Sequence, residues 1–241
     1  MRTFVEAVLI VIRPFALATL TALALALACA PAAPAPQPTP APTERPPQAA
    51  PAAAPSPAAG QAAPAAAGKT YAGVPPMTID VKKKYTAVMH TSEGDIRIQM
   101  LTEDAPATVN NFLFLAKDGF YNGVRFHRII KGFMVQTGDP LGNGTGNPGY
   151  KFNDEPVKRD YVPGTVAMAN SGPNTNGSQF FIMHGDYTGK LPRNYTIFGT
   201  VAQGQEVVDK IANVPVRPGT TGEASSPSKE VTITGIEVVE Q

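Results

Sequence analysis

The chain has 241 residues, with 20 Lys and Arg against 19 Asp and Glu, one Cys and no Trp. Four of the basic and three of the acidic residues precede Lys82, so the remaining 160 residues carry 16 charges of each sign. They lack the basic excess that nucleic-acid binding requires, and they are enough chain for one hydrophobic core. Because Cys29 is the only cysteine, this part has no disulfide, thiolate metal site or thiol nucleophile.

Residues 1–28 have the pattern of a signal peptide. Two arginines precede an apolar run of 14 residues that ends at Cys29. A helix that crosses a bilayer needs about 20 apolar residues, so the run favours a secretory leader. Ala26-Leu27-Ala28-Cys29 resembles the lipobox of bacterial lipoproteins, although that pattern usually places Leu where Ala26 stands and a small residue where Leu27 stands.

We therefore expect an extracytoplasmic protein whose Cys29 carries a lipid that anchors it to a membrane. Cleavage after Ala28 by the ordinary signal peptidase, which would give a soluble secreted protein, is the first alternative. An uncleaved leader is the second, because residues 7–12 extend the apolar stretch on the other side of Arg13-Pro14.

Residues 29–80 are expected to form a disordered tether. From residue 30 to residue 68 the chain is almost entirely Ala and Pro. Proline fixes φ and removes backbone donors, which excludes helices and sheets and favours an extended spacer of at most about 120 Å.

Residues 81–241 are expected to form one domain of short strands with two helices. Apolar alternation between turn signals predicts strands at 85–89, 94–100, 126–130, 133–137, 164–169, 179–183, 195–201 and 230–239. Helical spacing predicts one helix that opens at Ala105-Pro106 and closes at 117–119, and a second at 206–213. No strand-helix-strand alternation repeats, so the fold class is mainly β, an antiparallel sandwich or closed barrel.

Two segments carry unusual residues. Phe126–Asp139, FHRIIKGFMVQTGD, places Arg128 inside an apolar strand, where it either points to solvent by alternation or is a buried functional charge. Met168–Phe181, MANSGPNTNGSQFF, is a Gly-, Asn- and Pro-rich loop between two apolar strands, which composition alone identifies only as a turn region.

These two segments, followed by LPRNYTIFG at 191–199, resemble the cyclophilin family of peptidyl-prolyl isomerases over residues 85–239. The resemblance implies a closed eight-stranded antiparallel barrel capped by two α-helices, with the substrate groove on an outer face. It also implies that Arg128 is the catalytic arginine.

The resemblance implies eleven site residues. Three are expected to be catalytic: Arg128, Phe133 and Gln136. The others are expected to bind substrate as pocket wall, rim or backbone contacts: Met134, Ala169, Asn170, Ser171, Gln179, Phe181, Leu191 and Tyr195. Many family members have His where Tyr195 stands and Trp near Lys190, where this chain is one residue longer. Because the chain has no Trp, we expect weaker binding of cyclosporin-type inhibitors.

The chemistry of prolyl isomerisation suits these residues. Rotation about an amide meets a barrier of about 18–20 kcal/mol, whereas X-Pro cis and trans forms differ by only about 0.5–1 kcal/mol. A catalyst needs an apolar pocket for the proline ring and a donor for the nitrogen lone pair, and it needs no metal or cofactor. The expected function is isomerisation of X-Pro bonds in Pro-containing polypeptides, as a monomer that assists the folding of extracytoplasmic proteins.

Two other functions stay open from the sequence. One is a non-catalytic module that holds Pro-containing peptides, since Tyr195 and the missing Trp alter the rim of the groove. The other is a structural or solute-binding surface lipoprotein, which only the N-terminal anchor suggests. A further hypothesis is that the tether, with seven Ala-Pro pairs, occupies the groove of its own domain part of the time.

Overall fold

The computed structural model describes residues 69–219 and 222–241. The expected signal peptide at 1–28, Cys29 and the tether up to residue 68 lie outside the described residues. In the described part of the chain, neither of the two α-helices has the length and apolar character needed to cross a bilayer.

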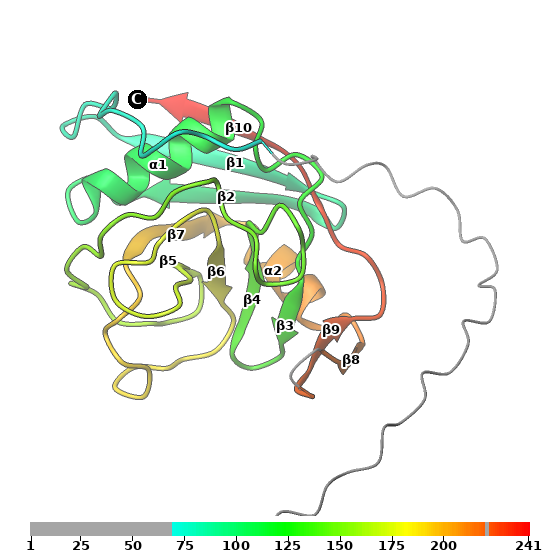
Figure 1. The fold of residues 1–241 in the computed structure, drawn as a ribbon. Coiled ribbons are helices and arrows are strands. Elements are labelled where there is room, and N and C mark those ends of the chain that lie inside the picture. The colour runs from blue at the N-terminus through cyan, green and yellow to red at the C-terminus, as the bar shows by residue number, and fades with distance from the viewer. Residues whose placement is uncertain (1–68, 220–221) are drawn as a thin grey trace, which may run out of the picture. The chain divides into compact units, whose positions relative to one another are not determined.

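Eight strands form one antiparallel sheet in the order β10-β1-β2-β7-β5-β6-β4-β3 (Figure 1). The strands are β1 (Tyr85–Thr91), β2 (Gly94–Met100), β3 (Arg128–Ile130), β4 (Met134–Thr137), β5 (Thr165–Met168), β6 (Phe180–Met183), β7 (Ile197–Gln203) and β10 (Ile233–Glu240). All eight fall on segments for which the sequence predicted strands. β1 and β2 form the expected hairpin, in which Thr91 pairs with Gly94.

The two end strands of the sheet, β3 and β10, are joined by the segments that precede them. Arg125 forms an isolated antiparallel bridge with Thr232. The N–H of Phe126 donates to the carbonyl of Val231 at 2.9 Å. The prediction of a mainly β fold with eight antiparallel strands and two helices is confirmed, and the sheet is a curled half-barrel whose seam is closed by these few bonds instead of a full ladder.

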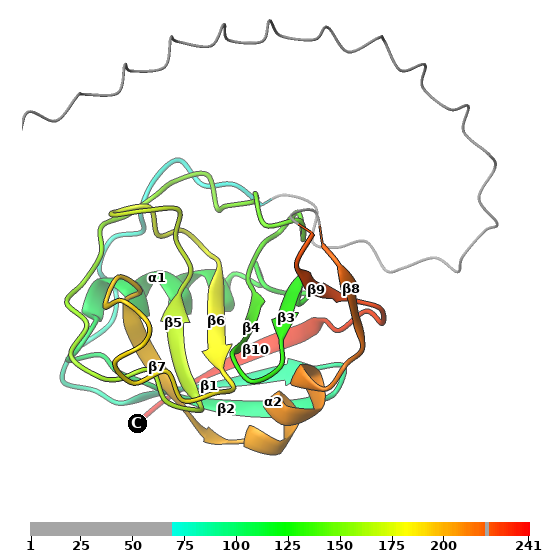
Figure 2. The same cartoon turned by 90° about the horizontal axis from the view of Figure 1, so that it is seen from below.

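Two helices cover the curled sheet (Figure 2). Helix α1 (Pro106–Lys117) begins with proline at its first turn, where a missing N–H costs nothing, and packs against β10 and β7. Helix α2 (Gln205–Ala212) packs against β2, β3 and β4. It follows Gly204, whose φ of 93° and whose closeness to the carbonyl of Asp95, 2.4 Å from a hypothetical Cβ, admit only glycine.

Residues 69–80 pack against α1, although the sequence analysis placed them in the tether. The ring of Tyr71 lies 5.3 Å from that of Phe114, and the N–H of Thr78 donates to the side chain of Asn110 at 2.9 Å. Ile79 is buried in the main core. This stretch carries the apolar residues that the Ala/Pro-rich segment lacks, and burial of these side chains stabilises its contact with the domain.

One short hairpin was not predicted. Strands β8 (Val216–Pro218) and β9 (Ala224–Pro227) pair with each other outside the main sheet, and β9 lies against β3. The Pro-, Gly-, Ser- and Thr-rich sequence of this segment is typical of a loop and lacks the apolar alternation that predicts a strand.

Candidate active site

The outer face of the sheet carries a row of side chains that crosses four strands. Arg128 on β3 lies opposite Gln136 on β4, Gln136 lies opposite Phe181 on β6, and Phe181 lies opposite Ala167 on β5. Cross-strand partners in an antiparallel sheet have neighbouring side chains on one face. The register therefore brings a charge, an amide and an aromatic ring together.

Alternation along each strand divides the apolar side chains into two clusters. On β4 and β6, Val135, Phe180 and Ile182 point into the main core, whereas Met134, Phe181 and Met183 belong to a second cluster. Successive residues of a strand point to opposite faces, so the second cluster lies on the same outer face as Arg128. Arg128 thus points outward, as alternation predicted, but onto a face that carries an apolar surface.

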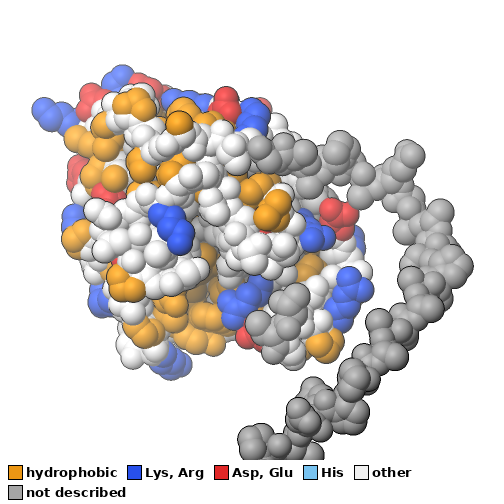
Figure 3. Space-filling view, viewed as in Figure 1, with side chains coloured by type: hydrophobic (Ala, Val, Ile, Leu, Met, Phe, Trp, Pro, Cys, Tyr) orange, Lys and Arg blue, Asp and Glu red, His pale blue; other side chains and the backbone are white. Residues whose placement is uncertain are grey.

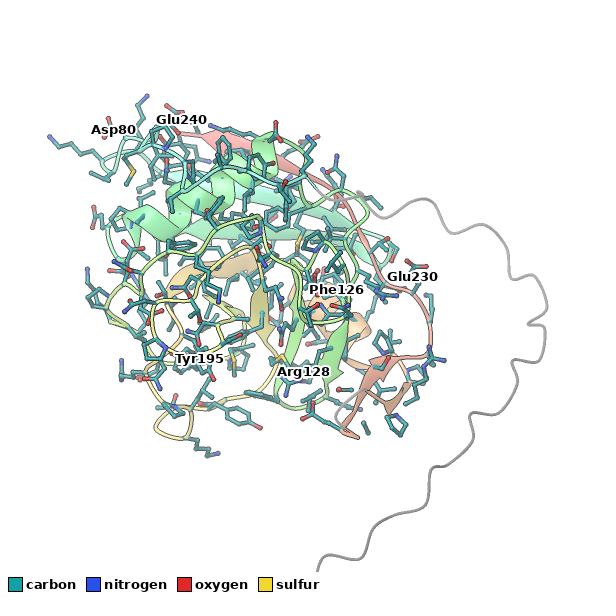
Figure 4. All side chains as sticks on the ribbon, viewed as in Figure 1. Asp80, Phe126, Arg128, Tyr195, Glu230 and Glu240 are labelled. Carbon is teal, nitrogen blue, oxygen red and sulfur yellow. The ribbon has the colours of Figure 1, made fainter. Side chains whose placement is uncertain are left out.

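The second cluster contains the five apolar residues expected to form the pocket and its rim: Phe133, Met134, Phe181, Leu191 and Tyr195. Met134 and Phe181 are buried, and the other three are partly exposed. Phe181 and Tyr195 meet edge to face with ring centroids 5.6 Å apart. Hydrophobic side chains gather on the face on which Arg128 and Tyr195 lie (Figures 3 and 4).

A polar cavity of about 390 Å³ adjoins this apolar surface. Its lining includes the five polar or small residues expected to contact a substrate backbone: Gln136, Ala169, Asn170, Ser171 and Gln179. Asn170 uses its side-chain amide within the fold, since Nδ2 donates to the carbonyl of Asn194 at 2.8 Å. All eleven expected site residues therefore lie either in the apolar cluster, along the cavity or in the row that joins them.

Hydrogen bonds connect Arg128 to the wall of the cavity. Nη1 of Arg128 donates to Oε1 of Gln136 at 3.4 Å, and Nε2 of Gln136 donates to Oε1 of Gln179 at 3.1 Å. Nε2 of Gln179 then donates to the carbonyls of Gly144 and Gly146 at 3.1 and 2.9 Å. Each glutamine accepts at Oε1 and donates from Nε2, so the network fixes the orientation of both side-chain amides.

Arg128 has a second partner that the sequence analysis missed. Glu223, which directly precedes β9, accepts hydrogen bonds from Nε and Nη2 of Arg128 at 2.8 and 3.1 Å. The hydrogen bond from Arg128 keeps the pKa of the Glu223 carboxyl below its ordinary value. No sequence pattern marks this residue, because the contact joins positions 95 residues apart.

A second missed residue supports the pocket. The ring of Tyr187 packs against that of Phe133 at an interplanar angle of 41°, with a centroid distance of 4.5 Å, and the N–H of Tyr187 donates to the carbonyl of Tyr161 at 2.8 Å. Tyr187 stands three residues before Lys190, near which many relatives carry Trp, and an aromatic residue in that loop was the only available signal.

The described residues hold no group of three or more His, Cys, Asp or Glu side chains able to bind a metal ion. His127, next to Arg128, has both ring nitrogens buried without a hydrogen-bond partner in the part of the chain that the structure describes. Burial lowers the pKa of His127, so the ring is neutral and adds no charge to the site.

Known families and proteins match this chain closely. The model of the cyclophilin type peptidyl-prolyl cis-trans isomerase family matches residues 86–238. Peptidyl-prolyl cis-trans isomerase-like 3 of Gallus gallus is 50% identical over 137 residues, which cover 55% of this chain and 84% of the relative. The peptidylprolyl isomerase domain and WD repeat-containing protein 1 of Mus musculus is 48% identical over 158 residues, 64% of this chain, but this match spans only 24% of that longer protein.

A solved structure shares the fold. The crystal structure of a cyclophilin type peptidyl-prolyl cis-trans isomerase of Cryptosporidium parvum, determined in the presence of the dipeptide Ala-Pro, has a TM-score of 0.59 and 33% sequence identity. It covers 65% of this chain and 99% of the other. The family match, the sheet order and the row from Arg128 to Phe181 agree, and the chain belongs to the family of cyclophilin-type peptidyl-prolyl cis-trans isomerases.

Proposed function

We propose that this protein accelerates cis-trans isomerisation of X-Pro bonds in polypeptides outside the cytoplasm, and that the reaction takes place on the row from Arg128 to Phe181. The observation that carries the proposal is the position of a charged guanidinium beside an apolar surface, in register with an amide side chain. Peptides that contain proline are the corresponding substrates.

The apolar cluster suits the ring of a proline residue. Phe133, Met134 and Phe181 offer carbon surface without a competing polar group, so the ring is bound by exclusion of water. The amide bond next to the ring then lies close to Arg128 and Gln136. Substrate backbone groups on the other side face the polar cavity, where side-chain amides can pair with them.

Arg128 acts on the nitrogen of the rotating bond. As the amide twists, the nitrogen lone pair leaves conjugation with the carbonyl and becomes a hydrogen-bond acceptor. A guanidinium N–H that meets this lone pair stabilises the twisted state more than either planar form, which lowers the barrier. The reaction breaks no covalent bond and transfers no proton.

Removal of the donor tests this function. With an Ala-Pro peptide and the full chain, we expect catalysed exchange, and we expect Arg128→Ala to reduce kcat/KM about 10²–10³-fold, equivalent to about 3–4 kcal/mol. Phe133→Ala should weaken substrate binding in the same assay. A folded wild-type chain that binds the peptide without accelerating exchange would instead identify a module that only holds proline peptides.

The site of action rests on the N-terminal sequence. We propose that residues 1–28 direct export, that Cys29 becomes lipid-modified, and that the Ala/Pro-rich segment spaces the isomerase from the membrane, where it assists the folding of exported proteins. The apolar run, the small residues before Cys29 and the absence of other cysteines support this proposal.

Expression in a bacterial host with a radiolabelled fatty acid tests the anchor. We expect label in the membrane fraction for the wild type, and an unlabelled chain for Cys29→Ser. Soluble, unlabelled wild-type protein in the extracytoplasmic fraction would show cleavage by the ordinary signal peptidase. Retention in the cytoplasm would contradict the whole proposal about localisation.

A further inference from the structure

The β8–β9 hairpin places a carboxylate on the arginine of the site. Within the hairpin the N–H of Gly219 donates to the carbonyl of Glu223 at 2.7 Å, and Val216 pairs with Pro227. β9 in turn packs against β3, the strand that begins with Arg128. Glu223 therefore approaches Arg128 from a framework that is separate from the strands that build the pocket.

We propose that Glu223 is a positioning residue for the isomerase reaction, one that holds the guanidinium of Arg128 in the orientation that faces the bound proline. The proposal rests on the function proposed above. It assigns a role in the reaction to the β8–β9 hairpin, whose described residues, 216–219 and 222–227, contribute no side chain to the apolar pocket and none to the polar cavity beside it.

The geometry of the guanidinium supports this role. Glu223 occupies the edge formed by Nε and Nη2, a two-bond arrangement that matches a planar carboxylate to a planar donor. Because the guanidinium is rigid, a fixed edge also fixes the direction of Nη1, which donates to Gln136 at 3.4 Å. The Nη1 hydrogens of Arg128, which do not bond to Glu223, lie on the side of Gln136 and the groove.

The two partners of Arg128 hold it from opposite sides. Gln136 belongs to the row of donors that ends at the carbonyls of Gly144 and Gly146, whereas Glu223 is the only carboxylate that pairs with Arg128 among residues 69–219 and 222–241. The side chain of Arg128 is 36% exposed, so packing alone does not immobilise its flexible stem. Loss of the carboxylate would leave only the 3.4 Å bond to Gln136.

A neighbouring glutamate offers a matched control. Glu230 lines a cavity next to the hairpin together with Arg125 and Arg217, it is exposed, and it has no hydrogen bond or ion pair within the described part of the chain. Figure 4 shows Glu230 apart from Arg128. Removal of Glu230 changes the net charge of this region by the same amount as removal of Glu223, but it leaves the contact between Glu223 and Arg128 intact.

The test compares full-length wild type, Glu223→Ala, Glu223→Gln and Glu230→Ala in Ala-Pro peptide exchange, with kcat and KM determined separately. For Glu223→Ala we expect kcat to fall about 10-fold with KM within about twofold, because a misdirected donor weakens the transition state more than the ground state. Glu223→Gln, which offers one acceptor oxygen, should lie between Glu223→Ala and the wild type. Glu230→Ala should match the wild type.

A spectroscopic measurement reports the position of Arg128 independently of turnover. In the nitrogen-15 spectrum the Nε–H signal of Arg128 should be sharp and slow to exchange in the wild type and in Glu230→Ala. It should broaden or disappear in Glu223→Ala, while the backbone spectrum of that variant stays dispersed.

Three results would overturn the inference. If the wild type is active and Glu223→Ala and Glu230→Ala have equal kcat, Glu223 has no positioning role, and the proposed isomerase function stands. A lower KM with unchanged kcat in Glu223→Ala would show that Glu223 competes with substrate for Arg128. An inactive wild type would overturn the proposed function, and this inference with it.

Discussion

Arg128 and Gln136 lie directly opposite each other on the antiparallel strands β3 and β4, and the guanidinium donates to the amide oxygen across the pair. The strand register, and not a flexible loop, sets this relationship. A one-residue slip of β3 would turn Arg128 toward the core and bring Ile129 to the groove. The face on which the Arg128 side chain lies is therefore set by the same hydrogen bonds that build the sheet.

This relationship predicts the effect of Gln136→Ala. The variant removes both the acceptor for Arg128 and the donor to Gln179, so the guanidinium and the cavity wall lose their connection. We expect kcat/KM to fall about 5–30-fold, equivalent to about 1–2 kcal/mol for the loss of two hydrogen bonds. Gln99→Ala, which changes a half-buried glutamine on β2, should leave exchange rates at the wild-type level. Equal activity of both variants would contradict the prediction.

The contact between the rings of Tyr187 and Phe133 predicts an effect on substrate binding. Tyr187→Ala removes a ring whose centroid lies 4.5 Å from that of Phe133, and Phe133 then has a wider range of orientations at the pocket wall. An aromatic pair contributes about 0.5–1.5 kcal/mol, so we expect KM for an Ala-Pro peptide to rise about 2–10-fold with kcat little changed. Tyr187→Phe keeps the ring and should behave as wild type. A loss in kcat alone would assign Tyr187 a different role.

The sequence predicted the parts of this fold that depend on local pattern. Two-residue periodicity located all eight strands of the sheet, and it correctly placed Arg128 on the outward face of β3. The pattern of residues alone left open whether this face is exposed to solvent or forms part of a functional site. Alternation gives the direction of a side chain and not what lies next to it. The resemblance to a family, based on two long motifs, supplied that information.

The contacts missed by the sequence analysis are non-local. Glu223 meets Arg128 across 95 positions, and the segment that carries it has the composition of an ordinary loop. The packing of residues 69–80 was missed for a similar reason. Tyr71 and Ile79 lie in a short stretch without helical or two-residue periodicity, and contacts with rings far along the chain, such as Phe114 and Phe120, bring Tyr71 to the core.

The start of helix α1 depends on a distant carboxylate. Ala105, the N-cap residue, offers no side-chain acceptor. Glu155 accepts hydrogen bonds from the N–H groups of Ala107 and Thr108 at 3.0 and 2.8 Å, and from the hydroxyl of Thr108 at 2.6 Å. It thus provides both the cap and the negative charge that a helix N-terminus favours.

Glu155→Ala should therefore destabilise the domain. We expect the free energy of unfolding in urea to fall by about 2 kcal/mol, since three bonds to a charged acceptor are lost. Glu103→Ala provides the matched control, because Glu103 lies closer in sequence to the helix but is exposed, and it should change stability by less than about 0.5 kcal/mol. A larger effect at Glu103 than at Glu155 would contradict this assignment of the cap.

His90 and His127 are expected to make opposite contributions to the pH dependence of stability above and below pH 6.5. A hydrogen bond to Asp95 raises the pKa of His90 above its ordinary 6.5, so the stability gained from protonated His90 is complete below 6.5 and is lost as pH rises through the raised value. Burial lowers the pKa of His127, so the unfolded chain takes up a proton first, and stability falls as pH drops below 6.5. The loss of stability due to His90 therefore occurs above pH 6.5, and the loss due to His127 occurs below it.

Single substitutions separate the two sides of this profile. His90→Gln should flatten the dependence of unfolding free energy on pH above 6.5 and leave the decline below it. His127→Phe keeps a ring of similar volume and should flatten the decline between pH 6.5 and about 5. Glu223, whose lowered pKa starts from 4.5, changes stability only at lower pH, so the interval tests His127 cleanly. If His127→Phe loses as much stability as wild type across that interval, another group is responsible for the decline.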